Sequence, residues 1–241
     1  MSREALIAEE QVILSSPQTL VTGASSRTKV KSEASQISYK VIKRSFDILV
    51  GLIGCLLTPP LAIFVKLAYM LSGDFGPIFF IQNRIGLHGR KFRFFKFRTM
   101  VEDADLKLIE LLEKEPYKSE WQKYRKLRND PRISKVGHFL RKTSLDEFPQ
   151  FWNVLKGDMS LIGNRPYLPR EKDDISERAY NNLIKTKPGI TGYWQVSGRS
   201  NIGFDDRIDL EEYYSKNASL GFDADIFFRT FRAVLSRDGA D

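Results

Sequence analysis

The stretch ILVGLIGCLLTPPLAIFV, residues 48–65, contains eighteen residues without a charge. As an α-helix it would be about 27 Å long, close to the thickness of the hydrocarbon core of a bilayer. Pro59 and Pro60 lie inside this stretch. Each proline lacks a backbone donor and clashes with the preceding helical turn. The sequence therefore predicts two helices with a break at the proline pair.

The charges on either side of this apolar stretch indicate how it meets a membrane. Lys40, Lys43 and Arg44 precede it, and Lys66 follows it. Because basic flanks favour the cytoplasmic side, both ends are expected there. The favoured interpretation is a re-entrant helix hairpin over residues 39–73, which enters the bilayer and returns on the same side. A proline-kinked spanning helix and a buried core helix of a soluble protein are the alternatives.

Amino-acid composition indicates how the rest of the chain is divided and which metal it could bind. A chain of 241 residues with 42% hydrophobic and 28% charged residues is long and apolar enough to fold around a core. Residues 1–38 carry four basic and four acidic side chains and no apolar periodicity, which predicts a disordered polar tail. Residues 74–241 form the predicted catalytic domain. One cysteine excludes an internal disulfide, and two histidines disfavour zinc, so any metal should be a hard ion such as Mg²⁺.

Positive charge is concentrated in one block of the chain. The net charge is +8, and residues 75–100 hold six basic side chains and no acidic one. Such a block predicts an anionic partner, which could be nucleic acid, phospholipid head groups or a phosphorylated substrate. The apolar stretch favours membrane lipids and argues against nucleic acid, so no nucleic-acid partner is expected.

Local patterns predict a mainly helical α/β fold with short strands. Residues 77–82 and 91–97 read as strands joined by a glycine-bearing turn, which predicts a β-hairpin. Thr99 is expected to cap a helix that runs to Glu115. Apolar residues at helical spacing predict a second helix that ends at Gly157. Residues 222–235 combine apolar and arginine side chains, which is typical of an amphipathic helix on a membrane surface or docked on the domain.

The chemistry is expected around two adjacent carboxylates, Asp146 and Glu147. Arg141 and Arg165 flank them in the sequence. Carboxylates, a cation site and arginines together suit phosphoryl chemistry. The alternative is purely structural, because Ser144-x-x-Glu147 is also a capping box at the start of a helix.

Further candidates lie on a strand and in a loop. Lys96 and Arg98 are expected on one face of the second strand. The glycine-rich segment 187–199 supplies Gly192, Gln195 and Arg199 together with an aromatic side chain. This mixture could hold a nucleotide base and its phosphates.

These motifs occur together, in order, across residues 40–241, and the chain is identified as a member of the bacterial sugar transferase family, the monotopic phosphoglycosyl transferases. The resemblance is carried by Lys43-Arg44-x-x-Asp47, Gln82-x-Arg84-x-Gly86, Lys96-Phe-Arg-Thr-Met100, Ser144-Leu-Asp-Glu-Phe-Pro-Gln150, Trp152-Asn-Val-Leu-Lys-Gly-Asp-Met-Ser160 and Pro188-Gly-Ile-Thr-Gly192.

The resemblance implies transfer of a sugar-1-phosphate from a UDP-sugar to undecaprenyl phosphate, with UMP as the second product. It implies that Asp146 forms a covalent phosphosugar intermediate in a ping-pong mechanism. Glu147, with Asp146, would hold Mg²⁺, and Arg141 and Arg165 would contact phosphate.

This activity would begin the assembly of an exopolysaccharide, capsule, O-antigen or glycoconjugate. The enzyme is expected at the bacterial inner (cytoplasmic) membrane with its catalytic domain on the cytoplasmic face, and a homodimer is allowed. The alternative function is a non-catalytic membrane adaptor of a polysaccharide assembly system.

Two positions depart from the family pattern. Asn164 precedes Arg165 where the family usually has proline, which leaves the rigidity of that loop open. A downstream acidic position could be either Asp209 or Glu211.

Overall fold

The computed structural model describes residues 33–198 and 202–236. The chain divides into two compact units, residues 1–37 and 38–241, and everything below concerns the second. Helices and short strands alternate along it in this order: α3 (Glu33–Leu71), β1 (Phe79–Ile85), η1 (Leu87–Gly89), β2 (Lys91–Phe97), α4 (Ala104–Leu112), α5 (Tyr117–Tyr124), α6 (Lys135–Lys142), η2 (Leu145–Glu147), α7 (Gln150–Lys156), β3 (Ser160–Ile162), η3 (Pro169–Asp174), α8 (Glu177–Leu183), β4 (Gly189–Thr191), α9 (Tyr193–Val196), α10 (Phe204–Asn217) and α11 (Leu220–Ser236).

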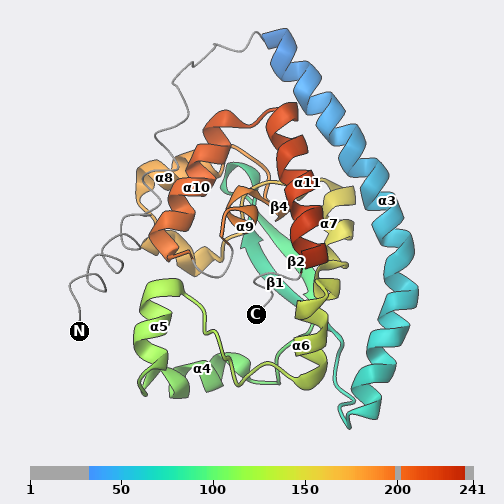
Figure 1. Cartoon of the computed structure of the whole chain (residues 1–241), viewed down its shortest axis with the longest axis vertical. Helices are drawn as coiled ribbons and strands as arrows, with labels where there is room; N and C mark the ends of the chain where they lie inside the picture. The colour runs from blue at the N-terminus through green and yellow to red at the C-terminus, as the bar shows by residue number, and fades with distance from the viewer. Residues whose placement is uncertain (1–32, 199–201, 237–241) are drawn as a thin grey trace, which may run out of the picture. The chain divides into compact units, whose positions relative to one another are not determined.

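The predicted mainly helical fold with short strands is confirmed (Figure 1). β1 and β2 form the expected antiparallel hairpin, in which Phe79 pairs with Phe97 and Ile85 with Lys91. A second sheet joins β3 and β4 in parallel. The hairpin places the end of β2 beside the start of β1, and the parallel pair brings the loop after β3 next to the loop before α9.

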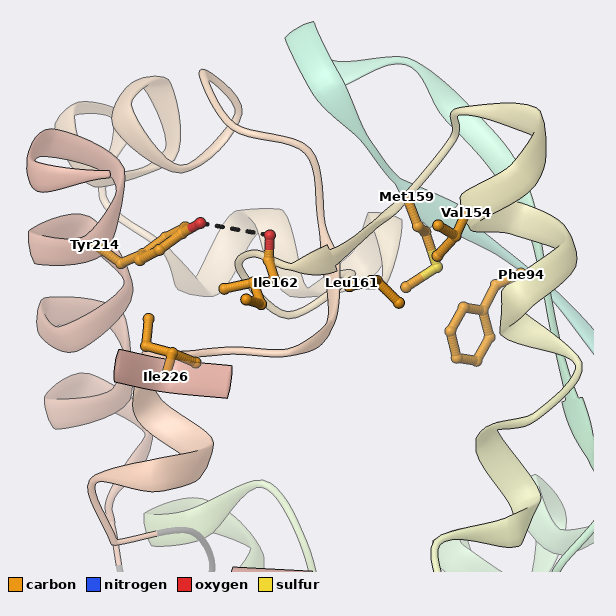
Figure 2. Close-up of a cluster of buried hydrophobic side chains, with 7 residues drawn as sticks. All are labelled: Phe94, Val154, Met159, Leu161, Ile162, Tyr214 and Ile226. Atoms are coloured by element: carbon orange, nitrogen blue, oxygen red, sulfur yellow. Dashed lines mark hydrogen bonds between the residues drawn. The ribbon is translucent and has the colours of Figure 1, made fainter. Parts of the chain in front are cut away.

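A compact hydrophobic core joins these strands to the later helices. Figure 2 shows its buried side chains, which come from β2, α7, β3, α10 and α11: Phe94, Val154, Met159, Leu161, Ile162, Tyr214 and Ile226. The Tyr214 hydroxyl donates a hydrogen bond of 3.4 Å to the carbonyl oxygen of Ile162. Burial of these apolar surfaces is the main stabilising term. It also holds the ends of β2 and β3 in a fixed relationship, which positions the side chains that follow them.

The predicted break in the N-terminal helix is not confirmed. α3 runs from Glu33 to Leu71 as one helix with Pro59 and Pro60 inside it. It begins within the segment that the sequence assigns to the tail, and residues 1–32 of that tail lie outside the described residues. Among the described helices, α3 is the one long and apolar enough to cross a membrane by length and composition alone.

From Ser38 onward, α3 contacts the rest of the second unit at several places along its length. Near its beginning, Lys43 Nζ donates to the carbonyl oxygen of Ile162 at 2.9 Å, and the buried Asp47 accepts from the backbone N–H of Leu161 at 2.9 Å. Near its end, Val65 and Tyr69 are buried in a core cluster. Both ends of α3 are therefore attached to the same folded domain.

The opposite face of α3 is apolar and exposed. Its uncovered side chains extend along the helix from Ile37 to Leu71 and include Phe46, Leu49, Leu52, Ile53, Leu56, Ile63, Phe64 and Leu67. An apolar face of this length marks an interaction surface, because monomeric soluble proteins rarely expose one.

Two other helices differ from the sequence prediction in their bounds. α4 begins at Ala104, and Thr99 is not its cap. Thr99 is instead buried, where its hydroxyl accepts a hydrogen bond from Arg141 Nε at 3.0 Å. The predicted amphipathic helix is present as α11, which leaves Phe228 and Phe231 exposed.

Candidate active site

The two adjacent carboxylates lie in a tight turn between α6 and α7. Asp146 and Glu147 belong to the 3-10 turn η2, and α7 begins only at Gln150. Ser144 has φ 56° and its side chain makes no capping hydrogen bond. The capping-box interpretation of Ser144 and Glu147 is therefore wrong, because a residue in the left-handed region does not present its hydroxyl to the first turn as an N-cap does.

Asp146 is largely buried, yet it lines an open pocket. The residue is 8% exposed, and the pocket has a volume of about 220 Å³. Burial raises the pKa of Asp146, while the nearby charges of Lys96 and Arg141 lower it. On balance the pKa of Asp146 is raised, and the two cations limit that shift because they favour its carboxylate form.

The pocket collects residues from distant parts of the chain. Its wall includes five residues that the sequence singled out: Lys96, Asp146, Glu147, Arg165 and Gln195. It is completed by Arg84, Phe94, Gln150, Pro166, Gly189, Ile190 and Trp194. Basic, acidic, amide and aromatic side chains thus share one cavity, which is smaller than the roughly 300 Å³ at which small-molecule sites usually begin.

Lys96 lies at the end of β2 and faces the carboxylates. Burial and then repulsion from Arg141 lower the pKa of Lys96 to about 8, although Asp146 opposes the shift. Its ammonium group also lies 5.3 Å from the centre of the Phe80 ring. Lys96 therefore carries a charge that is sensitive to pH just above neutrality.

Two other predicted basic residues, Arg141 and Arg98, are not among the residues that line the pocket. Arg141 is an electrostatic neighbour of Asp146 and is held by its hydrogen bond to Thr99. Arg98 is buried elsewhere, where its Nη2 forms an ion pair of 2.7 Å with Asp74 and its guanidinium lies 4.8 Å from the Tyr69 ring centre. The expectation that Arg98 shares a binding face with Lys96 is not met, since Arg98 follows β2 and joins it to α3.

Arg165 reaches the pocket from the loop after β3. Its Nη1 donates to both oxygens of Glu171, at 2.9 and 3.0 Å. Its backbone N–H donates to Glu211 Oε1 at 3.1 Å. The loop is therefore held by two carboxylates despite the Asn164 that replaces the family's proline.

The structure separates the two downstream acidic candidates. Asp209 is exposed, whereas Glu211 is 1% exposed and contacts the Arg165 loop. Burial raises the pKa of Glu211 to about 7, although the nearby Arg207 opposes the shift. Of the two candidates, Glu211 is thus the one that contacts the loop carrying Arg165.

Gly192 has a packing role. A Cβ atom at Gly192 would lie 2.2 Å from the carbonyl oxygen of Gly163, so the two loops approach each other only with glycine here. Gln195 follows at the start of α9, where its Nε2 donates to the carbonyl oxygen of Ile190 at 3.1 Å. Arg199 lies outside the described residues.

Sequence reasoning did not name the other seven lining residues as site residues, among them Arg84, Gln150 and Trp194. Arg84 and Gln150 occur within motifs quoted above and Trp194 lies in the glycine-rich segment 187–199, so a signal was present. The spacing along the chain could not show which members of each motif point to the cavity, because that depends on how β1, α7 and α9 pack together.

The acidic residues present are compatible with magnesium. The described part of the chain contains no cluster of three or more His, Cys, Asp or Glu residues with metal-binding geometry. Mg²⁺ is commonly bound by one or two carboxylates together with substrate phosphates. Asp146 and Glu147, which both line the pocket, match that donor set.

Known proteins resemble this chain over most of its length. The family model for bacterial sugar transferases matches residues 38–237. The undecaprenyl-phosphate galactose phosphotransferase of Salmonella typhimurium is 43% identical over 88% of this chain and 44% of its own length. The exopolysaccharide production protein ExoY of Sinorhizobium fredii is 40% identical over 82% of this chain and 87% of its own.

A third relative, the UDP-galactose-lipid carrier transferase of Erwinia amylovora, is 42% identical over 88% of this chain and 44% of its own length. The chain therefore spans less than half the length of the Salmonella and Erwinia relatives. The family match begins where the predicted tail ends and includes every described residue of the pocket. On this combination of sequence motifs, pocket and matched length, the chain belongs to the bacterial sugar transferase family.

Proposed function

We propose that this protein transfers a sugar-1-phosphate from a UDP-sugar to undecaprenyl phosphate, producing a polyprenyl diphosphate sugar and UMP. The main support is that Asp146 and Glu147 line one pocket with Lys96 and Arg165. A carboxylate beside several cations suits attack on a phosphate that carries negative charge of its own. The names of the Salmonella and Erwinia relatives suggest that galactose is the first sugar to test.

In the first half-reaction, a carboxylate oxygen of Asp146 attacks the phosphorus nearest the sugar. A bond forms between that oxygen and phosphorus, while the bond from phosphorus to the bridging oxygen breaks and leaves its electrons on UMP. Lys96 and Arg141 are placed to offset the developing charge, because both are electrostatic neighbours of Asp146. No proton has to leave Asp146 when it is ionised.

In the second half-reaction, a phosphate oxygen of undecaprenyl phosphate attacks the same phosphorus. The bond to Asp146 then breaks and restores the carboxylate. A covalent intermediate lets a water-soluble donor and a lipid acceptor use one pocket in turn, which is the ping-pong order. Glu147 and Asp146 would hold Mg²⁺ here, and that ion would neutralise phosphate charge when bound.

The contacts of α3 support a position at the membrane surface. Both ends of the helix are attached to the catalytic domain, through Lys43 and Asp47 at one end and Tyr69 at the other. A helix held in this way cannot cross a bilayer while the domain stays in water on one side. Its exposed apolar face would enter the cytoplasmic leaflet of the bacterial inner membrane, either as this continuous helix or as a re-entrant hairpin broken at Pro59.

A non-catalytic adaptor of a polysaccharide assembly system is the second candidate. It would have no need for an aspartate at the wall of a pocket with Lys96 and Arg141 as its charged neighbours. Release of UMP separates the two functions directly.

The test is an assay of the purified full chain with magnesium, undecaprenyl phosphate and a panel of UDP-sugars that begins with UDP-galactose. The wild type should release UMP with one sugar, and with the donor alone it should show a single-turnover burst. Asp146→Asn should lose both, while Asp158→Asn, which alters a partly exposed aspartate paired with Lys156, should retain them. Full turnover by Asp146→Asn would contradict the mechanism, and no UMP from any sugar would support the adaptor.

A further inference from the structure

Arg84 lines the pocket, but neither half-reaction of the proposed mechanism uses it. It lies one residue before the end of β1, and its side chain is 11% exposed at the pocket wall. Its guanidinium lies 5.3 Å from the centre of the Phe94 ring, which also lines the pocket. Packing on a rigid hairpin fixes its direction, as a preorganised binding group requires.

The partners of Arg84 within the protein are incomplete. Nη1 donates to the carbonyl oxygen of Pro166 at 3.0 Å, but Nε is buried without a hydrogen-bond partner among the described residues. Its nearest carboxylate contact is Glu171 Oε2, at 4.0 Å. A buried donor without a partner is costly, so such a group often marks a position where a ligand binds.

Glu171 is already committed to other donors. It accepts two hydrogen bonds from Arg165 Nη1, and its Oε2 also accepts one from the backbone N–H of Leu168 at 2.7 Å. Two guanidinium groups therefore share one carboxylate at this wall. Burial and repulsion from Arg165 lower the pKa of Arg84 to about 9, which Glu171 only partly opposes. An anion between the two arginines would neutralise the excess positive charge that one shared carboxylate leaves.

The position of this wall relative to Asp146 suggests which anion binds. Asp146 has Lys96 and Arg141 as its charged neighbours, whereas Arg84 has Arg165 and Glu171. The cations thus form two groups, Arg141 with the nucleophile and Arg84 with Arg165, and Lys96 interacts with both groups. A diphosphate has two phosphates to place, and attack by Asp146 requires the sugar-side phosphate to be the nearer one.

We propose that Arg84, together with Arg165, binds the nucleotide-side phosphate of the donor, the phosphate that leaves as part of UMP. This assignment rests on the proposed function and adds a residue to it. Because the leaving phosphate gains charge as the bridging bond breaks, a guanidinium there stabilises the departing group as well as the bound donor.

The test compares the binding of UMP and uridine to the full chain, with magnesium present, by calorimetry. Arg84→Gln retains an N–H donor for the Pro166 carbonyl but removes the charge. Arg93→Gln is the matched control, since Arg93 is exposed on the same hairpin. The wild type and Arg93→Gln should bind UMP more tightly than uridine. Arg84→Gln should bind UMP about 10- to 100-fold more weakly with uridine unchanged, as expected for loss of a charged hydrogen bond.

A second measurement on the wild type does not depend on the folding of a variant. Phenylglyoxal modification of Arg84, followed by mass spectrometry, should be slowed by UMP but not by uridine. Unchanged UMP affinity in folded Arg84→Gln, or modification that UMP does not slow, would overturn the assignment while leaving UMP release by the wild type intact. Failure of the proposed function would look different, because the wild type would then neither bind UMP nor release it.

Discussion

Glu211 and Arg165 are joined by a hydrogen bond of 3.1 Å, in which the backbone N–H of Arg165 donates to the buried carboxylate. The contact links α10 to the loop that carries a pocket arginine, across 46 residues of sequence. Glu211 Oε2 has no hydrogen-bond partner among the described residues. This carboxylate is therefore both a support for the Arg165 loop and a charge that is costly to bury.

Glu211→Gln should make the stability of the protein less sensitive to a rise of pH from acidic to neutral. Burial raises the pKa of Glu211 to about 7, above its ordinary value, so the folded state holds a proton that the unfolded state has already released. Stability is then lost as pH rises from about 4.5 to 7, by an amount on the order of 3 kcal/mol. The glutamine carbonyl can still accept from the Arg165 N–H without a charge.

Melting temperatures at pH 5 and pH 8 measure this effect. The difference between the two should shrink in Glu211→Gln compared with the wild type, and it should be unchanged in Asp205→Asn, which alters an exposed acid on the same helix. An equal pH dependence in the wild type and Glu211→Gln would show that Glu211 is ionised normally.

Lys96→Met should change the pH profile of UMP release as well as its rate. Since the pKa of Lys96 is lowered to about 8, its charge is present below that pH and lost above it. The wild-type rate should therefore fall above about pH 8. The variant should be slower by about 10²- to 10³-fold, typical for loss of one electrostatic contact to a transition state, and should lack this fall. A fall at the same pH in Lys96→Met would assign it to another group.

Gly54→Ala should loosen α3 from the catalytic domain. A Cβ atom at Gly54 would lie 2.1 Å from the Phe151 ring, so the helix and α7 must separate or the ring must move. The expected cost is about 1–3 kcal/mol of stability, measured by chemical unfolding. Gly51→Ala is the control, because its Cβ would meet atoms at 3.6 Å, an ordinary contact. Equal stabilities for the two variants would show that α3 does not pack on Phe151.

The two ends of α3 should lie on the same side of the membrane. In a Cys55→Ser background, Lys40→Cys and Ser72→Cys each place one thiol at an exposed position near one end. A membrane-impermeant maleimide should label neither thiol in intact spheroplasts and both after lysis. Labelling of only one of them from outside would establish a spanning helix and contradict the proposed attachment.

Local sequence patterns determined several of the elements and pointed to the two adjacent carboxylates. The β1–β2 hairpin, the helix that ends at Gly157 and the pair Asp146–Glu147 were all readable, because alternation, turn residues and helix stops act over a few neighbouring positions. The continuity of α3 through the proline pair could not be predicted from such local patterns. The packing of α3 against the domain outweighs the local preference of Pro59 and Pro60 for a break.

Only the tertiary structure decided which charged residues meet. Arg98 lies two residues from Lys96, yet it pairs with Asp74, while Arg84 from the other strand lines the pocket. Glu211 is buried beside Arg165, and Asp209 on the same helix faces water. The physical reason is that a motif specifies side-chain types, whereas the direction of each side chain follows from how the hydrophobic cores of β2, α7 and α10 pack together.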